Sequence, residues 1–490
     1  MEKRALTISL IVGGAMFMEN LDATALSTAL PQMAKSFAVS PVHMSAGITF
    51  YVVMLAVFIP VSGWVADRFG TRTVFSGAIT GFLVSSIACG ISQNLTQFVI
   101  ARIFQGIAGA MMVPVGRLTI LKNTSKKDLV TAIAYITWPG LIGPIAGPLI
   151  GGFFTTYFTW HWIFFINIPL GLLALALTHR YIPNSPAEIK RPLDWVGFIL
   201  SGLSLSGIMI AVEMISAGHP GNYSKSGLLL LVCMLLMAAA VYSSKKIKYP
   251  LIDYSILKIR TFAVTIYSGT LARMVINMAP FLLPLMFQIG FGLNPLQAGA
   301  LFMASMVGNL AMKPGAIWVT RKFDFRSVLI VNGLILVAIT FVQALLVPDT
   351  PTWLVVIVLF VSGLSRSMQF SSLNTLAYAD IPREKMSNAN TLYSTVQQVG
   401  LGLGVALGAV ALHVASLIHH TEKQYTMADF HLALYIVGII CFLSLLEYLR
   451  LKKTDGLNLR GLAPEIESSQ KTNQLQEKRL VYETSSESGQ

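Results

Sequence analysis

Apolar stretches of membrane-spanning length recur along the whole chain and are separated by short polar segments. A helix needs about 20 predominantly apolar residues to cross a bilayer, because it rises only about 1.5 Å per residue. The pattern therefore predicts fourteen spanning helices. We place them at about residues 6–30, 44–64, 73–91, 96–118, 130–154, 160–181, 194–215, 227–243, 261–289, 297–319, 327–347, 352–375, 389–416 and 431–450.

The composition favours an all-α polytopic membrane protein. Of the 490 residues, 54% are hydrophobic and only 12% are charged, and the mean hydropathy is +0.67. A soluble domain carries about twice that share of charged residues. Helices satisfy their own backbone hydrogen bonds in lipid, so a helix bundle surrounded by the lipid bilayer is the expected fold class.

The basic residues are distributed unevenly between the predicted loops. An even number of spans leaves both termini on one side, and 27 of the 35 Lys and Arg residues fall on that side. The positive-inside rule then places both termini in the cytoplasm of a multi-pass inner-membrane protein. The net charge of +13 is thus explained by topology, and no nucleic acid is expected as a partner.

Two predicted loops resemble each other and indicate an internal repeat. One reads WVADRFGTR, from Trp64 to Arg72, and the other reads WVTRKFDFR, from Trp318 to Arg326. Each follows the second helix of a six-helix block, and repeated halves of this kind are typical of transporters. The expected units are an N-terminal six-helix bundle at 1–185, two inserted helices with a linker at 186–260, a C-terminal six-helix bundle at 261–450 and a disordered cytoplasmic tail at 451–490.

Two acidic residues lie inside the first predicted helix. Glu19 and Asp22 share one face about a turn apart, and an ionisable group at this depth suggests a functional site. Counting residues from the outer helix ends puts Asp22 and Arg102 at similar depth, so the two could pair. Either the pair is a permanent structural contact, or Asp22, Glu19 and Arg102 couple transport to protons; Glu19 could instead hydrogen-bond to Gln105. Glu213, near the outer end of an inserted helix, is expected to reach water.

The loop after the second predicted helix, GWVADRFGTR, is a candidate cytoplasmic gate. Its acid can accept hydrogen bonds from a helix N-terminus on the facing half, and its arginines can bind acids or helix C-terminal carbonyls. A loop that only sets topology would explain the basic residues but not the acid and the glycines. The candidate gate residues are Gly63, Asp67, Arg68, Gly70 and Arg72.

Small residues and prolines alternate along the fifth predicted helix. Glycines at spacings of three and four form one stripe, which lets another helix approach closely. Prolines leave carbonyls unpaired and bend a helix, so this segment is expected to shape how a central cavity opens. The residues are Gly140, Gly143, Pro144, Gly147, Pro148, Gly151 and Gly152.

Two arginines fall in the middle of predicted helices of the second half, with no acid on the same helices. Because a buried unpaired cation is costly, Arg273 and Arg366 must be solvated by amides and carbonyls or must receive an anion. With these arginines, the candidate substrate-cavity residues are Asn277, Gln369 and Asn374. They make an anionic metabolite or a metal–carboxylate chelate, such as a citrate complex, a serious alternative substrate.

Four motifs make the chain resemble the major facilitator superfamily, in its fourteen-helix branch of drug:proton antiporters (EmrB/QacA-like). They are GWVADRFGTR from Gly63, RIFQGIAGA from Arg102, GLIGPIAGPLIGG from Gly140 and LDATALSTALP from Leu21. Finer features, AMMVPVGRLT from Ala110 and WHWIFFINIP from Trp160, are similar to the MdtD-type subgroup of multidrug transporters. The resemblance implies a major facilitator fold of two six-helix bundles plus two inserted helices.

The residues and the resemblance together predict a proton-coupled efflux transporter that exports small amphipathic compounds by alternating access. Export rather than import is implied by the resemblance alone. No P-loop GxxxxGK[ST] is present, so the proton gradient is the expected energy source, with no cofactor, and a monomer is expected to suffice. A lipid-modifying membrane enzyme would need clustered His, Asp or Cys at one surface, and a receptor or scaffold would need a large soluble domain.

Neither the cysteines nor the histidines form a pattern that predicts a metal site. The three cysteines lie inside predicted helices and have no CxxC spacing, so we expect them to pack as small apolar residues. The outer loop at 413–431 holds several histidines at irregular spacing, and a solvated loop is the expected structure.

Overall fold

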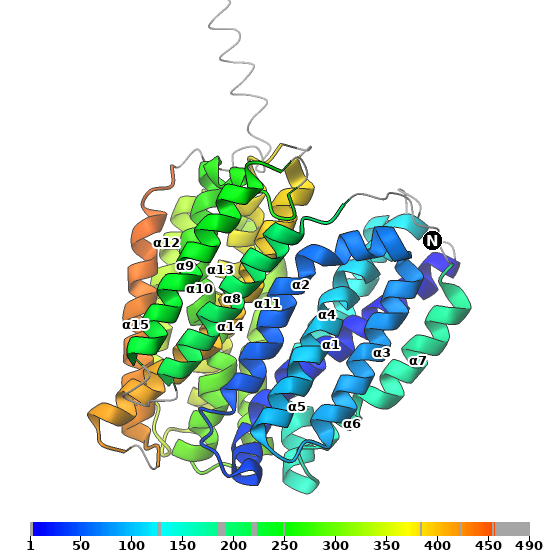
Figure 1. Ribbon diagram of the computed structural model, residues 1–490. Coiled ribbons are helices and arrows are strands. Elements are labelled where there is room, and N and C mark those ends of the chain that lie inside the picture. Colours follow the sequence, from blue (N-terminus) through cyan, green and yellow to red (C-terminus); the bar gives the residue numbers. More distant parts are fainter. Residues whose placement is uncertain are drawn as a thin grey trace, which may run out of the picture.

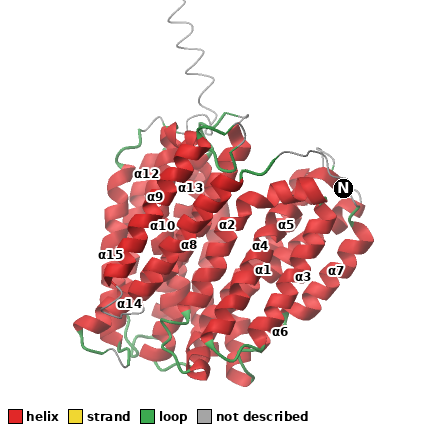
Figure 2. Cartoon of the chain, in the orientation of Figure 1, coloured by secondary structure: helices red, strands yellow, loops and turns green. Residues whose placement is uncertain are grey.

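The computed structural model consists of packed helices (Figure 2). It describes residues 3–124, 129–183, 192–216, 223–247, 250–382, 385–421, 424–452 and 455, and the predicted tail lies almost wholly outside them. No strand occurs in those ranges. The fold is therefore all-helical, as the apolar pattern predicts.

Fourteen helices of fifteen residues or more and three shorter helical segments make up the described part of the chain. The long helices are α1 (Lys3–Phe37), α2 (Ser45–Phe69), α3 (Thr71–Gly90), α4 (Leu95–Asn123), α5 (Leu129–Tyr157), α7 (Asn167–Tyr181), α8 (Trp195–Ser216), α9 (Tyr223–Ser244), α10 (Arg260–Leu285), α11 (Pro295–Lys322), α12 (Phe325–Gln343), α13 (Thr352–Ala377), α14 (Met386–Ile418) and α15 (Met427–Tyr448). The short ones are α6 (Trp162–Phe165), the 3-10 helix η2 (Tyr254–Lys258) and the π-helix η3 (Met286–Gly290).

Twelve segments of the described chain are long and apolar enough to cross a membrane. The fourteen spans expected from the sequence are therefore not confirmed as a count. Helices α5 and α11 are long enough at 29 and 28 residues, but they are not among the twelve. In α11 the polar residues Gln297, Asn309 and Lys313 lower the hydropathy, and a helix packed between other helices can carry such residues.

Local sequence explains where several helices begin. Asn94 and Asn294 cap α4 and α11 by accepting from the backbone N–H of the residue three positions on, and Pro295 follows Asn294 at the first helical position. The first helix passes through Pro31 and ends at Phe37, later than predicted. The predicted span at 160–181 is divided at Ile166 into α6 and α7.

The helices form two groups that meet along two seams (Figure 1). In the first group α1 packs along α5, and α4 packs between α2 and α3; in the second, α10 packs on α14 and α11 on α13. The groups touch where α2 meets α14 and where α5 meets α11. The inserted pair α8 and α9 covers the first seam, because α8 contacts both α2 and α14.

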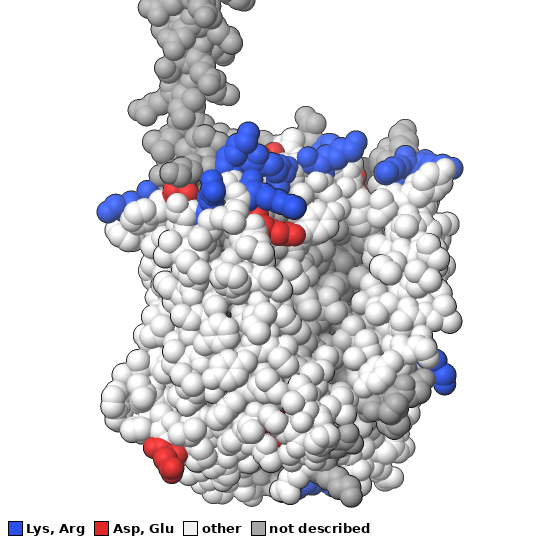
Figure 3. Space-filling model, turned by 90° about the vertical axis from the view of Figure 1, so that its left-hand side faces the viewer, with Lys and Arg blue, Asp and Glu red and all other residues white. Residues whose placement is uncertain are grey.

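The two ends of the molecule differ in charge. Lys and Arg side chains gather at the end that carries the N-terminus, the upper end in Figures 1 and 3. The described part of the chain both starts and finishes at this end, where Arg260 at the start of α10 forms a 2.5 Å ion pair with Asp455. We refer to it below as the terminal end and to the other as the far end.

Candidate functional site

A cavity of about 590 Å³ lies between the two helix groups. One wall comes from α1, α2 and α4 and includes Glu19, Gly63 and Arg117. The opposite wall is a polar face of α14: Ser387, Asn390, Thr391, Ser394, Gln397 and Gln398. Ser387 and Gly63 both lie close to the terminal ends of their helices, so the cavity occupies the terminal half of the bundle.

At the far end, the two groups are held together by direct contacts. Gln288 donates from Nε2 to the Thr28 carbonyl at 3.0 Å, and the Leu296 backbone N–H donates to the Thr156 hydroxyl at 3.1 Å. A Cβ added to Gly299 of α11 would lie 2.2 Å from the Pro148 carbonyl oxygen of α5. The molecule is therefore closed at the far end in this conformation, while its cavity lies toward the terminal end.

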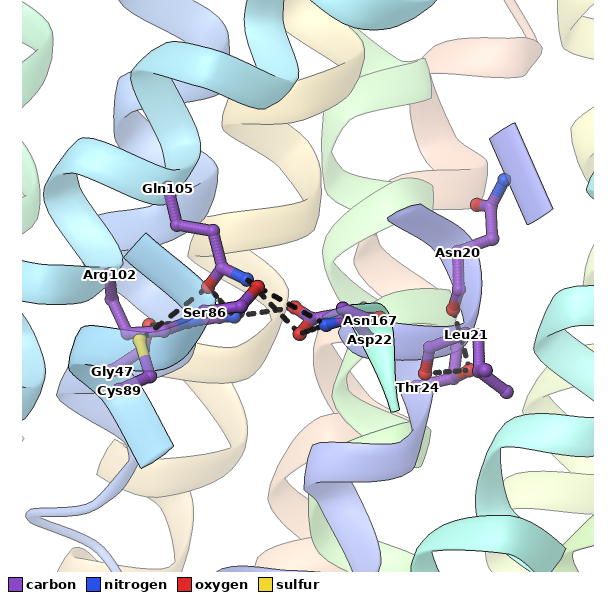
Figure 4. Close-up of polar contacts among 10 residues, drawn as sticks. All are labelled: Asn20, Leu21, Asp22, Thr24, Gly47, Ser86, Cys89, Arg102, Gln105 and Asn167. Atoms are coloured by element: carbon purple, nitrogen blue, oxygen red, sulfur yellow. Dashed lines mark hydrogen bonds and ion pairs between the residues drawn. The ribbon is translucent and has the colours of Figure 1, made fainter. Parts of the chain in front are cut away.

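Asp22 of α1 and Arg102 of α4 form a fully buried ion pair, with 2.6 Å between Asp22 Oδ2 and Arg102 Nη1 (Figure 4). Arg102 also donates from Nε to the Gly47 carbonyl at 3.1 Å, and its guanidinium lies 4.1 Å from the centre of the Tyr51 ring. The pairing expected from equal helix depth is therefore present. The ring contact adds cation–π attraction for the arginine.

Three donors converge on the Asp22 carboxylate. Besides Arg102, Gln105 donates from Nε2 to Asp22 Oδ1 at 3.1 Å and Asn167 donates from Nδ2 to the same oxygen at 2.9 Å. Gln105 also accepts from Arg102 Nη1 at 2.6 Å and donates to Ser86 at 2.9 Å. The network therefore joins α1, α3, α4 and α7 around one charge, and it favours the ionised form of the acid.

Sequence reasoning missed Ser86, Asn167 and Tyr51 in this network. Asn167 begins α7 and is fully buried, so an amide at the start of an otherwise apolar helix was the available signal. Ser86 carries no such signal, because a serine inside a spanning helix commonly bonds to its own backbone. Tyr51 is an ordinary aromatic residue until the fold brings it to the arginine.

Glu19 lies one turn from Asp22 but in a different environment. It belongs to the cavity wall, and its Oε2 atom is buried with no hydrogen-bond partner in the described part of the chain. The alternative bond to Gln105 is not formed, because that amide is used by Asp22, Ser86 and Arg102. Glu19 is therefore the carboxyl available to the cavity.

The predicted substrate-cavity residues of the second half do not come together, and none of them lines the 590 Å³ cavity. Arg273 donates to the Thr265 carbonyl at 3.0 Å and to the Tyr393 hydroxyl at 2.5 Å. Tyr393 in turn donates to Asn374, so Arg273 and Asn374 are linked through a tyrosine that the sequence did not single out. Asn277 packs near Gly404 between α10 and α14.

The other buried arginine is held by a different pair of helices. Arg366 donates from Nη1 to the Ser305 hydroxyl of α11 at 3.3 Å, and no carboxylate pairs with it among the described residues. Gln369 instead accepts from Asn332 of α12 at 2.8 Å. These residues are solvated by their own half, so their role toward a substrate stays a prediction.

The candidate gate residues all make their contacts within the first half. Asp67 faces Lys122 of α4 at 3.7 Å, and Arg72 donates to the His179 carbonyl at the end of α7 at 3.0 Å. Arg68 lies over the Trp64 ring at 5.4 Å. Gly70 joins α2 to α3 with φ of +85°, a conformation that favours glycine. No side chain of this loop bridges to the second half in the described structure, while the cavity lies open beside it.

The glycines of α5 contact two different helices. A Cβ added at Gly143, Gly147 or Gly151 would meet α1 within 3.0 Å, whereas one at Gly152 would meet the Pro295 carbonyl of α11 at 2.6 Å. Gly140 faces Met16 less closely, at 3.5 Å. The helix runs from Leu129 to Tyr157 through its prolines. The stripe thus holds α1, and its end forms part of the far-end closure.

The histidine-containing loop at the far end is organised around Asp429. This buried acid accepts from Thr421 at 2.7 Å and from the Thr426 backbone at 2.7 Å, and it lies 2.8 Å from His419 Nδ1. His431 contacts the Leu346 carbonyl at 2.9 Å. No group of three or more His, Cys, Asp or Glu that could hold a metal ion occurs in the parts of the chain that are described.

Comparisons with known proteins agree with this architecture. The family model described as Major Facilitator Superfamily matches residues 12–405. The "Putative multidrug resistance protein MdtD" of Serratia proteamaculans is 36% identical over 446 residues, which cover 90% of this chain and 92% of that protein. The protein of the same name from Pectobacterium atrosepticum is 35% identical over 430 residues, covering 85% and 91%.

Solved structures of transporters share the fold at low sequence identity. A D-xylose-proton symporter aligns with a TM-score of 0.65 and 14% identity, covering 92% of this chain and 98% of the symporter. A point mutant of the nucleoside transporter NupG aligns with a TM-score of 0.64 and 14% identity, covering 91% and 99%. At this identity the likeness concerns the arrangement of helices and not the substrate.

Proposed function

The chain belongs to the Major Facilitator Superfamily and is a multi-span membrane transport protein rather than an enzyme, and on that basis we propose that it is a proton-coupled antiporter that exports small amphipathic compounds by alternating access. One observation carries the proposal. The cavity between the two halves holds an unpartnered carboxyl, Glu19, one turn from the buried Asp22–Arg102 pair.

The closed far end supports alternating access. Export requires a cavity that opens to each side in turn, and the present conformation has its cavity at one end and its inter-half contacts at the other. The close approach of Gly299 to Pro148 needs the absence of a side chain and involves little polar bonding. Such a contact can separate when the halves rock, while the gate loop closes the terminal end.

The two carboxyls of α1 support proton coupling. Substrate and proton need not bind together; each must only prefer a different conformation. A cationic substrate in the cavity would compete with a proton for Glu19, and the Asp22–Arg102 pair would hold α1 against α4 while that exchange occurs. Coupling through Glu19, Asp22 and Arg102 needs no cofactor besides the proton gradient.

The placement in the membrane is also part of the proposal. We take α5 and α11 as spanning helices as well, because each packs along helices that meet the length and hydropathy requirement. The count is then fourteen: a bundle at 1–185, the inserted pair at 186–260 and a bundle at 261–450, working as a monomer. The basic terminal end would face the cytoplasm of a bacterial inner membrane.

A second candidate substrate follows from the cations of the second half. Arg273 and Arg366 are buried and have only neutral partners in the described structure, and Arg117 adds a third guanidinium in the cavity wall. An anionic metabolite or a metal–carboxylate chelate would bring charge that these residues lack. This candidate requires the second-half arginines to reach the cavity in another conformation.

Proton movement in everted membrane vesicles tests the proposal. Native protein is compared with Glu19→Gln and with a matched control, Glu447→Gln, whose carboxyl accepts from Ser268 away from the cavity. The substrates are lipophilic cations in one set and tricarboxylates, with and without divalent metal, in the other. Release of protons by cations in the native and control vesicles but not in Glu19→Gln supports the antiporter.

The other outcomes decide between the candidates. A response to tricarboxylates alone would replace the amphipathic substrate by the anionic one. Normal exchange in Glu19→Gln would remove that residue from the coupling mechanism. No proton movement with either set of substrates would contradict the proposed antiport.

A further inference from the structure

A second, smaller recess lies at the far end, between the inserted helix α8 and helices α2 and α4. Its volume is about 240 Å³. Its lining is apolar apart from His43 and Glu213, and the apolar wall includes Phe50, Ile210 and Met214. The recess shares no lining residue with the central cavity, so it requires its own explanation.

Glu213 is the unusual member of this recess. The side chain was expected to reach water, but its Oε2 atom is buried and has no hydrogen-bond partner in the described parts of the chain. A carboxylate in an apolar recess requires a cation, and a neutral carboxylic acid requires an acceptor for its proton. The described residues supply neither to this oxygen.

The depth of the recess is that of a membrane interface. Glu213 lies in the last turn of α8, Phe50 lies in the second turn of α2, and Leu95 is the first residue of α4. At a rise of about 1.5 Å per residue, all three lie within roughly 8 Å of their helix ends. Amphipathic molecules concentrate at this depth, with their polar groups toward the head groups and their apolar parts toward the acyl chains.

We propose that this recess is a peripheral binding site for a monovalent organic ammonium ion that carries one apolar substituent. The cationic nitrogen pairs with the Glu213 carboxylate, and the substituent packs against Phe50, Ile210 and Met214. Charge complementarity selects the cation, because Glu213 is the only acid in the lining. The site is separate from the central cavity and does not depend on the proposed transport function.

The size of the recess limits the ligand. A volume of about 240 Å³ is below the range of about 300–1,000 Å³ that is usual for drug-sized ligands. A trimethylammonium group with a single aromatic ring is therefore a suitable probe, and a larger cation would leave part of its body in the lipid. The neutral carbon isostere of the same probe tests whether the charge matters.

Equilibrium binding to the full chain in lipid nanodiscs tests the site. The probe is radiolabelled benzyltrimethylammonium, neopentylbenzene is its neutral isostere, and empty nanodiscs correct for partitioning into lipid. All measurements use a Glu19→Gln background, so that the carboxyl of the central cavity does not bind the probe. We expect one saturable equivalent, with affinity roughly tenfold weaker after Glu213→Gln, as for the loss of one partly desolvated ion pair.

A steric pair of variants keeps the carboxylate and tests the recess itself. Ile210→Trp fills the recess and should abolish saturable binding, whereas Ile199→Trp, at a position on the same helix that is 50% exposed, should not. Three results would each overturn the proposal: no saturable binding in the starting protein, equal binding after Glu213→Gln, or equal binding of the neutral isostere.

Discussion

Replacing Asp22 by Asn removes the charge that balances a fully buried guanidinium. Asp22 and Arg102 each have 0% side-chain exposure, so neither water nor salt can compensate the arginine once the acid is neutral. Asparagine keeps one acceptor oxygen but presents an NH₂ group to Gln105 and Asn167, which donate to this site at present. The substitution therefore costs both an ion pair and hydrogen bonds.

The magnitude follows from the burial. Removing one partner of a buried ion pair typically destabilises a protein by about 3–5 kcal/mol, whereas replacing both partners by neutral residues is often close to neutral. We therefore expect Asp22→Asn and Arg102→Met to cost about 3–5 kcal/mol each in the free energy of unfolding. The double variant should cost no more than either single one, which corresponds to a coupling of at least about 3 kcal/mol.

Equilibrium unfolding of the purified protein in mixed micelles, followed by tryptophan fluorescence, measures these values. The double variant also separates stability from transport, because it should fold but should not exchange protons for substrate. A cost of less than about 1 kcal/mol for Asp22→Asn, or a double variant whose cost equals the sum of the singles, would refute the argument that these two charges balance each other.

Three further perturbations test other contacts. Gly299→Ala puts a Cβ 2.2 Å from the Pro148 carbonyl oxygen, so labelling of single cysteines at the far end should become faster as that end opens; unchanged labelling would mean that the contact does not hold it closed. Tyr393→Phe removes the hydroxyl that Arg273 donates to and should lower the free energy of unfolding by about 1–3 kcal/mol, with a smaller loss arguing that the ring rather than the hydroxyl solvates the guanidinium. Asp67→Asn should change stability by less than about 1 kcal/mol, because its pair with the lysine of α4 is 3.7 Å long and 46% exposed on the Asp67 side; a larger loss in thermal unfolding would show that the gate loop contributes more than this pair.

The positions of the helices and the Asp22–Arg102 pair could be predicted because both depend on regular geometry. A spanning helix must be long and apolar, so its place is visible in the sequence, and its constant rise converts residue number into depth. Two opposite charges at one depth then have a reason to meet. The same rise predicts the stripe of glycines that packs against α1, since small residues at spacings of three and four share one helix face.

Residues whose role depends on helix rotation could not be predicted in this way. Arg273 and Arg366 lie at the buried depth that the sequence indicates, yet they face Tyr393 and Ser305 rather than the central cavity. Depth says nothing about the direction in which a side chain points. For the same reason the polar face of α14, from Ser387 to Gln398, was not recognised as a cavity wall, because serine, asparagine and glutamine carry no charge that would mark them.

The two carboxyls of α1 show how one helix face can serve two purposes. Asp22 accepts from three donors on two other helices, and protonating it would leave Arg102 uncompensated and weaken every one of those bonds. Glu19 has a buried oxygen with no partner in the described structure and borders the cavity, so protonation of this group breaks no hydrogen bond to that oxygen. A proton carrier must tolerate both of its protonation states. By this reasoning Glu19 is the group that exchanges a proton with a substrate, and Asp22 holds α1 in register with α4 so that Glu19 stays at the cavity wall.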